Sequence, residues 1–237
     1  MEKIISGNDV YFLQVFNNKI IINDNYEGII ILDHEINVLR KIKLFEGIYI
    51  YSSFVIGENE FILFCPEDNN VVYVDIEKNQ VYIIDVPADI ENEVFRGVIL
   101  NNRNRCIFVT NKNKYIVLDK NKKALKRVNV DSQFDKFVIK SESEIFKSNN
   151  NILQMYNDCN NRDVRDNTSV VTYEDRIIMY NNQEVKEIFP KDGYIFNNAK
   201  IMNINKHLYL VILSNKKDND EISILSVINI NNRIITE

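Results

Sequence analysis

The segment VVYVDIEKNQVYIIDV, residues 71–86, has two apolar stretches on either side of the polar residues DIEKNQ. Val, Ile and Tyr are common in β-strands because they fit a pleated, half-buried surface. Asp is common at the start of a turn because its carboxylate can bond to backbone N–H groups two residues further on. The segment therefore predicts one β-strand, a turn that begins at Asp75 and a second β-strand.

The same pattern returns four times along the chain. The other copies are IIILDHEINVLRKIKL (29–44), YIVLDKNKKALKRVNV (115–130), RIIMYNNQEVKEIFP (176–190) and ILSVININNRIITE (224–237). The corner residues are Asp33, Asp75, Asp119, Asn181 and Asn229, which gives spacings of 42, 44, 62 and 48 residues. Periods of about 40 to 45 residues with strands between them are typical of the blades of a β-propeller.

The repeats predict a single all-β domain over residues 1–237, a five-bladed β-propeller of four-stranded antiparallel blades. The expected blades cover residues 10–44, 48–86, 94–130, 136–190 and 194–237. We expect residues 2–5 to help close the ring by pairing of the N- and C-terminal strands, because closure removes a free sheet edge. A blade cannot bury both of its faces alone, so stacking of neighbouring blades would build the core.

The order of an apolar strand, an Asp corner and another apolar strand resembles the broad group of β-propeller repeat proteins. The resemblance covers nearly the whole chain and implies a fold, with no particular activity attached to it. The chain contains no Trp. It therefore lacks both the Trp-Asp dipeptide of one large propeller class and the docking Trp of the quinone-binding class.

The formal net charge is −5, and basic residues alternate with acids on most turns. Phosphate binding needs a clustered basic stripe, so this distribution predicts no nucleic-acid partner. The one basic cluster, KNKKALKR at 120–127, fits a solvated hairpin or a phosphate site, and the hairpin is favoured because exposed edges often carry Lys. A mildly acidic protein is steered towards cationic partners.

The three cysteines, Cys65, Cys106 and Cys159, are odd in number and show no CxxC spacing. They predict free thiols in a reducing compartment. Residues 1–16 form no apolar signal segment, and no run of about 18 apolar residues predicts a membrane span. We therefore expect a cytoplasmic protein without membrane association or cofactor, and its richness in Asn, Ile and Lys suggests an AT-rich bacterial genome.

Catalytic motifs are missing from the sequence, which has no glycine-rich phosphate loop, HExxH or GxSxG and only two histidines, His34 and His207. We therefore predict no enzymatic activity. Oxygen ligands for Ca²⁺ could come from Asp158, Asn160, Asp163 and Asp166. Their spacing misses the EF-hand loop, and Arg162 and Arg165 would oppose a cation, so a solvated loop is favoured and no metal site is predicted.

Two polar loops are the places where we expect a partner to bind. The spacing of 62 residues predicts an insertion at 157–168 in the fourth blade, and SNKKDNDE (214–221) predicts a second loop in the fifth. Long insertions in a compact β fold are disproportionately functional. The contact candidates are the acidic residues Asp158, Asp163, Asp166, Asp218, Asp220 and Glu221.

These features favour a non-enzymatic protein-binding module that covers the surface of a basic protein partner and is a monomer on its own. One form of such a module is a cytoplasmic immunity protein that neutralises a cationic toxin. The alternative is a carbohydrate-binding or glycoside-active five-bladed propeller with an axial acidic pocket. It would require two carboxylates that converge near the innermost strands and titrate at different pH.

Overall fold

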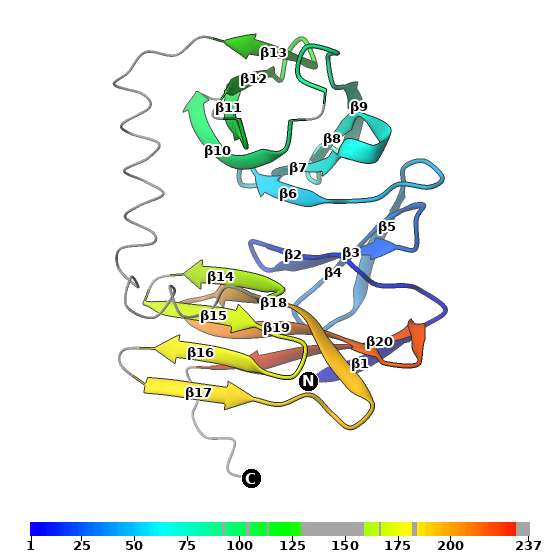
Figure 1. Ribbon diagram of the computed structural model, residues 1–237, viewed down its shortest axis with the longest axis vertical. Coiled ribbons are helices and arrows are strands. Elements are labelled where there is room, and N and C mark those ends of the chain that lie inside the picture. The colour runs from blue at the N-terminus through cyan, green and yellow to red at the C-terminus, as the bar shows by residue number, and fades with distance from the viewer. Residues whose placement is uncertain are drawn as a thin grey trace. The chain divides into compact units, whose positions relative to one another are not determined.

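The computed structural model describes residues 1–91, 93–102, 105–112, 114–128, 159–165, 167–181 and 184–230. Within these ranges the chain forms five four-stranded antiparallel sheets, and its single helical element is the 3₁₀ turn η1 (Pro66–Asp68) (Figure 1). The predicted all-β class is confirmed. The chain divides into two compact units, Met1–Gly47 with Asn151–Glu237 and Ile48–Asn150.

The first unit contains three of the sheets. One has the order β2-β3-β4-β5, with β2 (Leu13–Phe16), β3 (Lys19–Asp24), β4 (Gly28–Leu32) and β5 (Val38–Lys43). The next has the order β14-β15-β16-β17, with β14 (Asn161–Arg165), β15 (Thr168–Thr172), β16 (Ile177–Asn181) and β17 (Glu184–Ile188). The last has the order β1-β20-β19-β18, with β1 (Glu2–Ser6), β18 (Tyr194–Ile204), β19 (His207–Lys216) and β20 (Asn219–Asn229).

The second unit contains the other two sheets. One has the order β6-β7-β8-β9, with β6 (Ser52–Val55), β7 (Glu60–Cys65), β8 (Asn70–Asp75) and β9 (Gln80–Asp85). The other has the order β10-β11-β12-β13, with β10 (Phe95–Asn102), β11 (Arg105–Thr110), β12 (Tyr115–Asp119) and β13 (Ala124–Val128). In four of the five sheets the strands follow one another in sequence order, as the repeat predicts.

The corner residues that define the repeat lie at or directly after the end of one strand in each sheet, namely β4, β8, β12, β16 and β20. Oδ1 of Asp33 accepts a hydrogen bond from the backbone N–H of Glu35 at 2.9 Å, directly after β4. Oδ1 of Asp75, the last residue of β8, accepts one from the N–H of Lys78, also at 2.9 Å. The predicted turn chemistry of the Asp corners is thus confirmed at these positions.

Apolar side chains from neighbouring sheets build the core of each unit. In the first unit, Leu13 and Ile22 of one sheet pack with Val211 and Leu225 of another. In the second unit, a single cluster joins the two sheets and includes the stacked rings of Phe64, Phe95 and Phe108. Burial of these apolar side chains is the main stabilising contribution to such stacked sheets.

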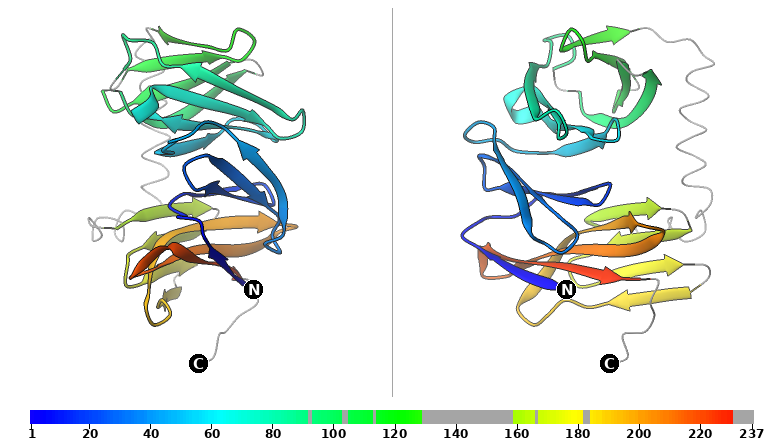
Figure 2. Two further views of the ribbon diagram at one scale, coloured as in Figure 1. Left: turned by 90° about the vertical axis from the view of Figure 1, so that its right-hand side faces the viewer. Right: turned by 180° about the vertical axis from the view of Figure 1, so that it is seen from behind.

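The N-terminal strand β1 forms the edge of the sheet that contains the last strands of the chain. It pairs antiparallel with β20, from Glu2 opposite Ser226 to Ser6 opposite Ile222 (Figure 2). The fourth strand of this sheet is therefore β1, whereas residues 231–237, at the end of the fifth predicted blade, lie outside the described residues. Closure of a ring stays a prediction.

Two sequence predictions are wrong. The insertion loop expected at 157–168 contains strand β14 over residues 161–165, which pairs with β15, and residues 136–158, at the start of the fourth predicted blade, lie outside the described residues. Polar side chains on β14 are compatible with a partly buried strand because they form hydrogen bonds to β18. The loop expected at 214–221 is a hairpin, because β19 continues to Lys216 and β20 begins at Asn219.

The described part of the chain contains no helix of the length and apolar character that a membrane crossing requires.

Candidate functional site: an acidic hollow

Four connections of the first unit meet at one end of two sheets. They are the segment after β1, the β3–β4 turn, the segment after β5 and the β19–β20 turn, and antiparallel pairing brings their ends together. Between them lies an open hollow with a volume of about 840 Å³. Its lining residues are Gly7, Asp9, Asn25, Tyr26, Glu27, Glu46, Gly47, Asn219, Asp220 and Glu221. We call this site the acidic hollow.

The charge of the acidic hollow is of one sign. Five of its ten described lining residues are Asp or Glu, and none of the ten is Lys or Arg. One of these acids, Glu27, forms an ion pair of 3.4 Å with Lys43, in which both side chains are mostly exposed. Exposed pairs of this kind contribute little and are weakened by salt. The hollow therefore presents negative charge to the solvent.

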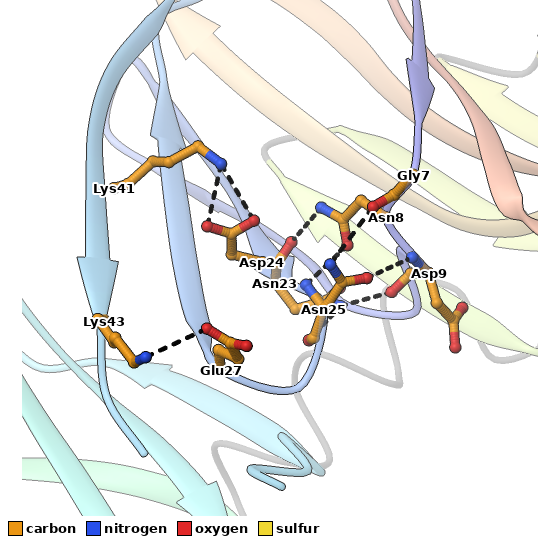
Figure 3. Close-up of polar contacts among 9 residues, drawn as sticks. All are labelled: Gly7, Asn8, Asp9, Asn23, Asp24, Asn25, Glu27, Lys41 and Lys43. Atoms are coloured by element: carbon orange, nitrogen blue, oxygen red, sulfur yellow. Dashed lines mark hydrogen bonds and ion pairs between the residues drawn. The ribbon is translucent and has the colours of Figure 1, made fainter. Parts of the chain in front are cut away.

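Asn23 of β3 connects Asp9, in the segment before β2, to Asn25 of the β3–β4 turn, and both of these residues line the hollow (Figure 3). Its side chain is fully buried, with 0% exposed surface. Oδ1 accepts hydrogen bonds from the backbone N–H groups of Tyr11 and Phe12, both at 3.0 Å. Nδ2 donates to the carbonyl oxygens of Asp9 at 2.6 Å and Asn25 at 2.9 Å. The two acceptor and two donor positions of this amide are thus all used.

Two further Asn side chains extend this network. Oδ1 of Asn8 accepts a hydrogen bond from the N–H of Asn25 at 2.7 Å, and Nδ2 of Asn8 donates to the carbonyl oxygen of Asn23 at 3.0 Å. Oδ1 of Asn25 in turn accepts the N–H of Asp9 at 3.0 Å (Figure 3). Asn25 has φ 49°, in the left-handed region that Asn tolerates better than most residues. Both the N–H and the carbonyl of Asp9 are therefore fixed.

An aromatic pair stands beside the carboxylates. The phenol of Tyr26 donates a hydrogen bond to Oδ2 of Asp9 at 2.6 Å. The ring of Tyr26 stacks on that of Tyr11, with 5.2 Å between the centroids, and its residue is 40% exposed. A carboxylate next to an accessible aromatic ring suits a cationic group, which is attracted to both.

The structure brings two of the predicted contact residues together. Asp220 and Glu221, at the start of β20, line the acidic hollow, and the carbonyl of Glu221 accepts the N–H of Gly7 at 3.0 Å. Asp218 lies in the exposed β19–β20 turn. Asp158 and Asp166 lie outside the described residues.

Asp163 lies away from this group, on β14. Its Oδ2 accepts the backbone N–H of Ile201 on β18 at 2.6 Å. Nearby, the ammonium group of Lys200 donates to Oδ1 of Asn161 at 3.2 Å. Burial lowers the pKa of Lys200, and the Asp163 carboxylate acts in the opposite direction. Asp163 thus links two strands of the first unit, and contact with a partner stays a prediction for it.

Sequence inspection missed Asp9, Tyr26, Glu27 and Glu46, which complete the acidic hollow with the predicted pair. These residues sit in short connections with no unusual length or motif. The predicted topology could have identified them. In an antiparallel sheet, the connection that leads into the first strand and the turn between the second and third strands lie at the same end. A search for long insertions could not detect them.

The described residues contain no cluster of metal-binding side chains. No three His, Cys, Asp or Glu side chains there lie close enough to share a metal ion. Burial raises the pKa of Cys65 to about 12 and that of Cys106 to about 11, which leaves both thiols protonated at neutral pH. Strands β2, β6, β10, β14 and β18, with which the predicted blades begin, contain one acid among their described residues, Asp163. These strands do not supply the carboxylate pair that the glycosidase alternative requires.

The basic cluster at 120–127 contacts acids and an aromatic ring of its own unit. Lys120 forms an ion pair with Glu60. Nζ of Lys123 lies 3.4 Å from the centroid of the Tyr82 ring. The guanidinium of Arg127 pairs with Asp89 at 3.4 Å and with Glu93 at 2.8 Å. The cluster lies on the predicted hairpin, since β12 and β13 pair from Asp119 opposite Ala124, and the absence of a phosphate site stays a prediction.

Comparison with known proteins assigns no family, because no family model and no curated protein matches the sequence. Among solved structures, selenomethionine-substituted virginiamycin B lyase from Staphylococcus aureus is similar over 97% of this chain and 72% of its own, with 9% identity and a TM-score of 0.43. YCF48 bound to D1 peptide is similar over 93% of this chain and 68% of its own, with 9% identity and a TM-score of 0.42. A streptogramin B lyase is similar over 95% and 72%, with 9% identity and a TM-score of 0.40. At such identities and TM-scores no activity, partner or detailed fold follows for this chain.

Proposed function

We propose that this protein is a non-enzymatic binding module that uses the acidic hollow to engage a basic protein partner. The observation that carries the proposal is the set of five acids, without Lys or Arg, that converge in the hollow from four separate connections. Convergence from separate parts of the chain distinguishes this surface from acids scattered on turns. Complementary charge of this kind mainly increases the association rate and the specificity.

The mechanism is occlusion of the partner surface. Negative potential steers the partner to the hollow, and a contact of about 800 Å² on each protein then covers the groups beneath it. Because exposed charges are screened by salt, we expect association to weaken steeply as ionic strength rises. If the covered surface contains an active site, binding inhibits the partner, as expected for an immunity protein that neutralises a cationic toxin in the cytoplasm.

The proposed scaffold is a single-domain, monomeric propeller in which the five sheets are five blades and the β1–β20 pairing closes the ring. The five four-stranded sheets and the repeated Asp corners support this proposal. A closed ring would hold the turns around the hollow on a rigid base, as binding surfaces on loops require. Small-angle scattering by the purified chain, compared with the profile of a five-bladed ring, tests the scaffold independently of any partner.

The binding proposal is tested by capture from the source cells at low salt with matched baits. The test bait carries Asp220→Asn and Glu221→Gln, which remove two charges from the hollow without changing side-chain size. The control bait carries Glu35→Gln in the β4–β5 turn and Glu184→Gln at the start of β17, which together remove the same charge away from the hollow. We expect a basic protein to be retained by the wild type and the control bait and to be lost from the test bait.

Equal retention of the basic protein by all three baits would exclude the hollow as its site. Capture of sugars without any protein, in repeated experiments, would overturn the binding-module proposal and favour the carbohydrate alternative. For a captured enzyme, the toxin form of the proposal requires that stoichiometric wild-type protein abolishes its activity and that the test variant does not.

A further inference from the structure

We propose that Asn23 is the positioning residue of the acidic hollow, and that with Asn25 it holds the Asp9 carboxylate and the Tyr26 phenol in place before a ligand arrives. This inference rests on the proposed function, since it concerns how the same site achieves binding. The side chain of Asn23 is buried and neutral, so its contribution to binding is not apparent from the acids that line the hollow, which we call the rim carboxylates.

The segment before β2 depends on Asn23 for three of its backbone hydrogen bonds, while Asn215 donates another to the carbonyl of Val10 at 2.9 Å. The N–H groups of Tyr11 and Phe12 and the carbonyl of Asp9 are all bonded to the one amide of Asn23. Buried or partly buried backbone groups without partners are costly, so the segment adopts the conformation in which Asn23 satisfies them. A Leu at this position would fill the space without any of these bonds, and an Asp would face two carbonyl oxygens with a carboxylate oxygen.

Asn25 adds the second constraint. Its Oδ1 accepts the N–H of Asp9 at 3.0 Å, while Nδ2 of Asn23 bonds to the carbonyl of the same residue at 2.6 Å. Asp9 is therefore held on both sides of its Cα, and its carboxylate in turn accepts the Tyr26 phenol at 2.6 Å. The network fixes one carboxylate and one ring relative to each other.

Such pre-organisation improves affinity because less loop and side-chain ordering is left to occur on binding. Loss of the network leaves the number of rim carboxylates unchanged and should therefore leave the salt dependence of binding nearly unchanged. It should weaken binding mainly through faster dissociation, since affinity differences among variants of one interface lie mostly in the dissociation rate. This combination separates positioning from charge.

The test uses a hexa-arginine peptide as a cationic probe and measures its dissociation constant and dissociation rate at several salt concentrations. Asn25→Gly keeps the left-handed backbone at φ 49° and removes only the side-chain bonds. Asn23→Asp keeps the acceptor, removes both donors and adds a carboxyl group, so the salt dependence is compared between the wild type and Asn25→Gly alone. We expect each variant to raise the dissociation constant about tenfold, the factor that corresponds to about 1.4 kcal/mol.

Two controls exclude a general loss of structure. Asn17→Gly changes another left-handed Asn, with φ 53°, in the β2–β3 turn at the opposite end of the same sheet. Ile20→Val removes a methyl group from a fully buried side chain of β3, the strand that carries Asn23. We expect both controls to bind the peptide like the wild type, although the second lowers the melting temperature.

The outcomes separate the inference from the function on which it rests. If Asp220→Asn/Glu221→Gln weakens binding while Asn25→Gly and Asn23→Asp bind like the wild type, the positioning inference is overturned and the site stands. Weakening by Asn17→Gly and Ile20→Val to the same extent also overturns it, because any destabilisation would then suffice. If none of the hollow variants changes binding, the proposed site itself fails.

Discussion

Replacement of Phe108 by Ala should be among the most destabilising changes in the chain. Phe108 lies on β11 with 0% of its surface exposed, and its ring stacks on Phe95 with 4.9 Å between the centroids. Phe95 stacks in turn on Phe64 at 4.5 Å, so the three rings join the two sheets of residues 48–128. Loss of a fully buried Phe typically costs about 3–5 kcal/mol, which is a large share of the roughly 5–15 kcal/mol by which a domain is stable.

Urea unfolding followed by far-UV circular dichroism measures this effect. For a slope of about 2–3 kcal/mol/M, the expected loss lowers the midpoint by about 1–2.5 M. The matched control is Phe189→Ala, because Phe189 is 66% exposed and its removal should change stability by no more than about 0.5 kcal/mol. Equal effects of the two substitutions would refute the argument from burial. If the chain is a single domain, the whole urea unfolding transition of Phe108→Ala should shift to lower urea concentration. Separation of the curve into two transitions would refute the single domain.

Two further predictions concern a glycine and an acid. Ala at position 28 would place its Cβ 2.1 Å from the carbonyl oxygen of Ile42 on the neighbouring strand. Gly28→Ala should therefore lower the free energy of unfolding by about 1–3 kcal/mol. An unchanged melting temperature would contradict this. Burial raises the pKa of Asp75, but hydrogen bonds from the backbone N–H and the ammonium of Lys78 outweigh burial and leave that pKa below 3.8. Since the folded-state pKa is the lower one, this stabilisation is present above about pH 4 and is lost as the pH falls through the folded pKa. The urea midpoint of the wild type should therefore fall between about pH 5 and about pH 3, and that of Asp75→Asn should fall by less over the same range.

The repeat was predictable from the sequence because its signal is local. Asp33 and Asp75 act within two to four residues, through hydrogen bonds to the backbone of the same turn. The apolar stretches on either side supply strands with little dependence on what they pack against. Strand pairs and corners of the sheets at 13–43, 52–85 and 95–128 consequently agree with the prediction.

Strand β14 shows what local signals omit. Its sequence NRDVR has one apolar residue, and it is a strand because partners far along the chain satisfy its polar groups, such as Asn198 for the amide of Asn161 at 2.6 Å. The acidic hollow was missed for the same reason, since Asp9 and Glu221 are more than 200 residues apart in sequence. The pairing of β1 with β20 and the hydrogen bond from Asn215 to Val10 bring these two residues to one site.

The polar residues of the hollow divide into two chemical classes according to burial. A carboxylate at position 23 would be desolvated and would face the carbonyl oxygens of Asp9 and Asn25, whereas a neutral amide can donate to both. The carboxylates stand on the rim, where water solvates them and a partner can reach them. Rim acids can therefore be neutralised at a cost near zero in stability, within about 0.5 kcal/mol, although binding should suffer. The buried amide cannot be changed without loss of the backbone geometry on which the rim depends. We therefore expect Glu221→Gln to weaken binding with little change in stability, whereas Asn23→Asp should lower both stability and binding.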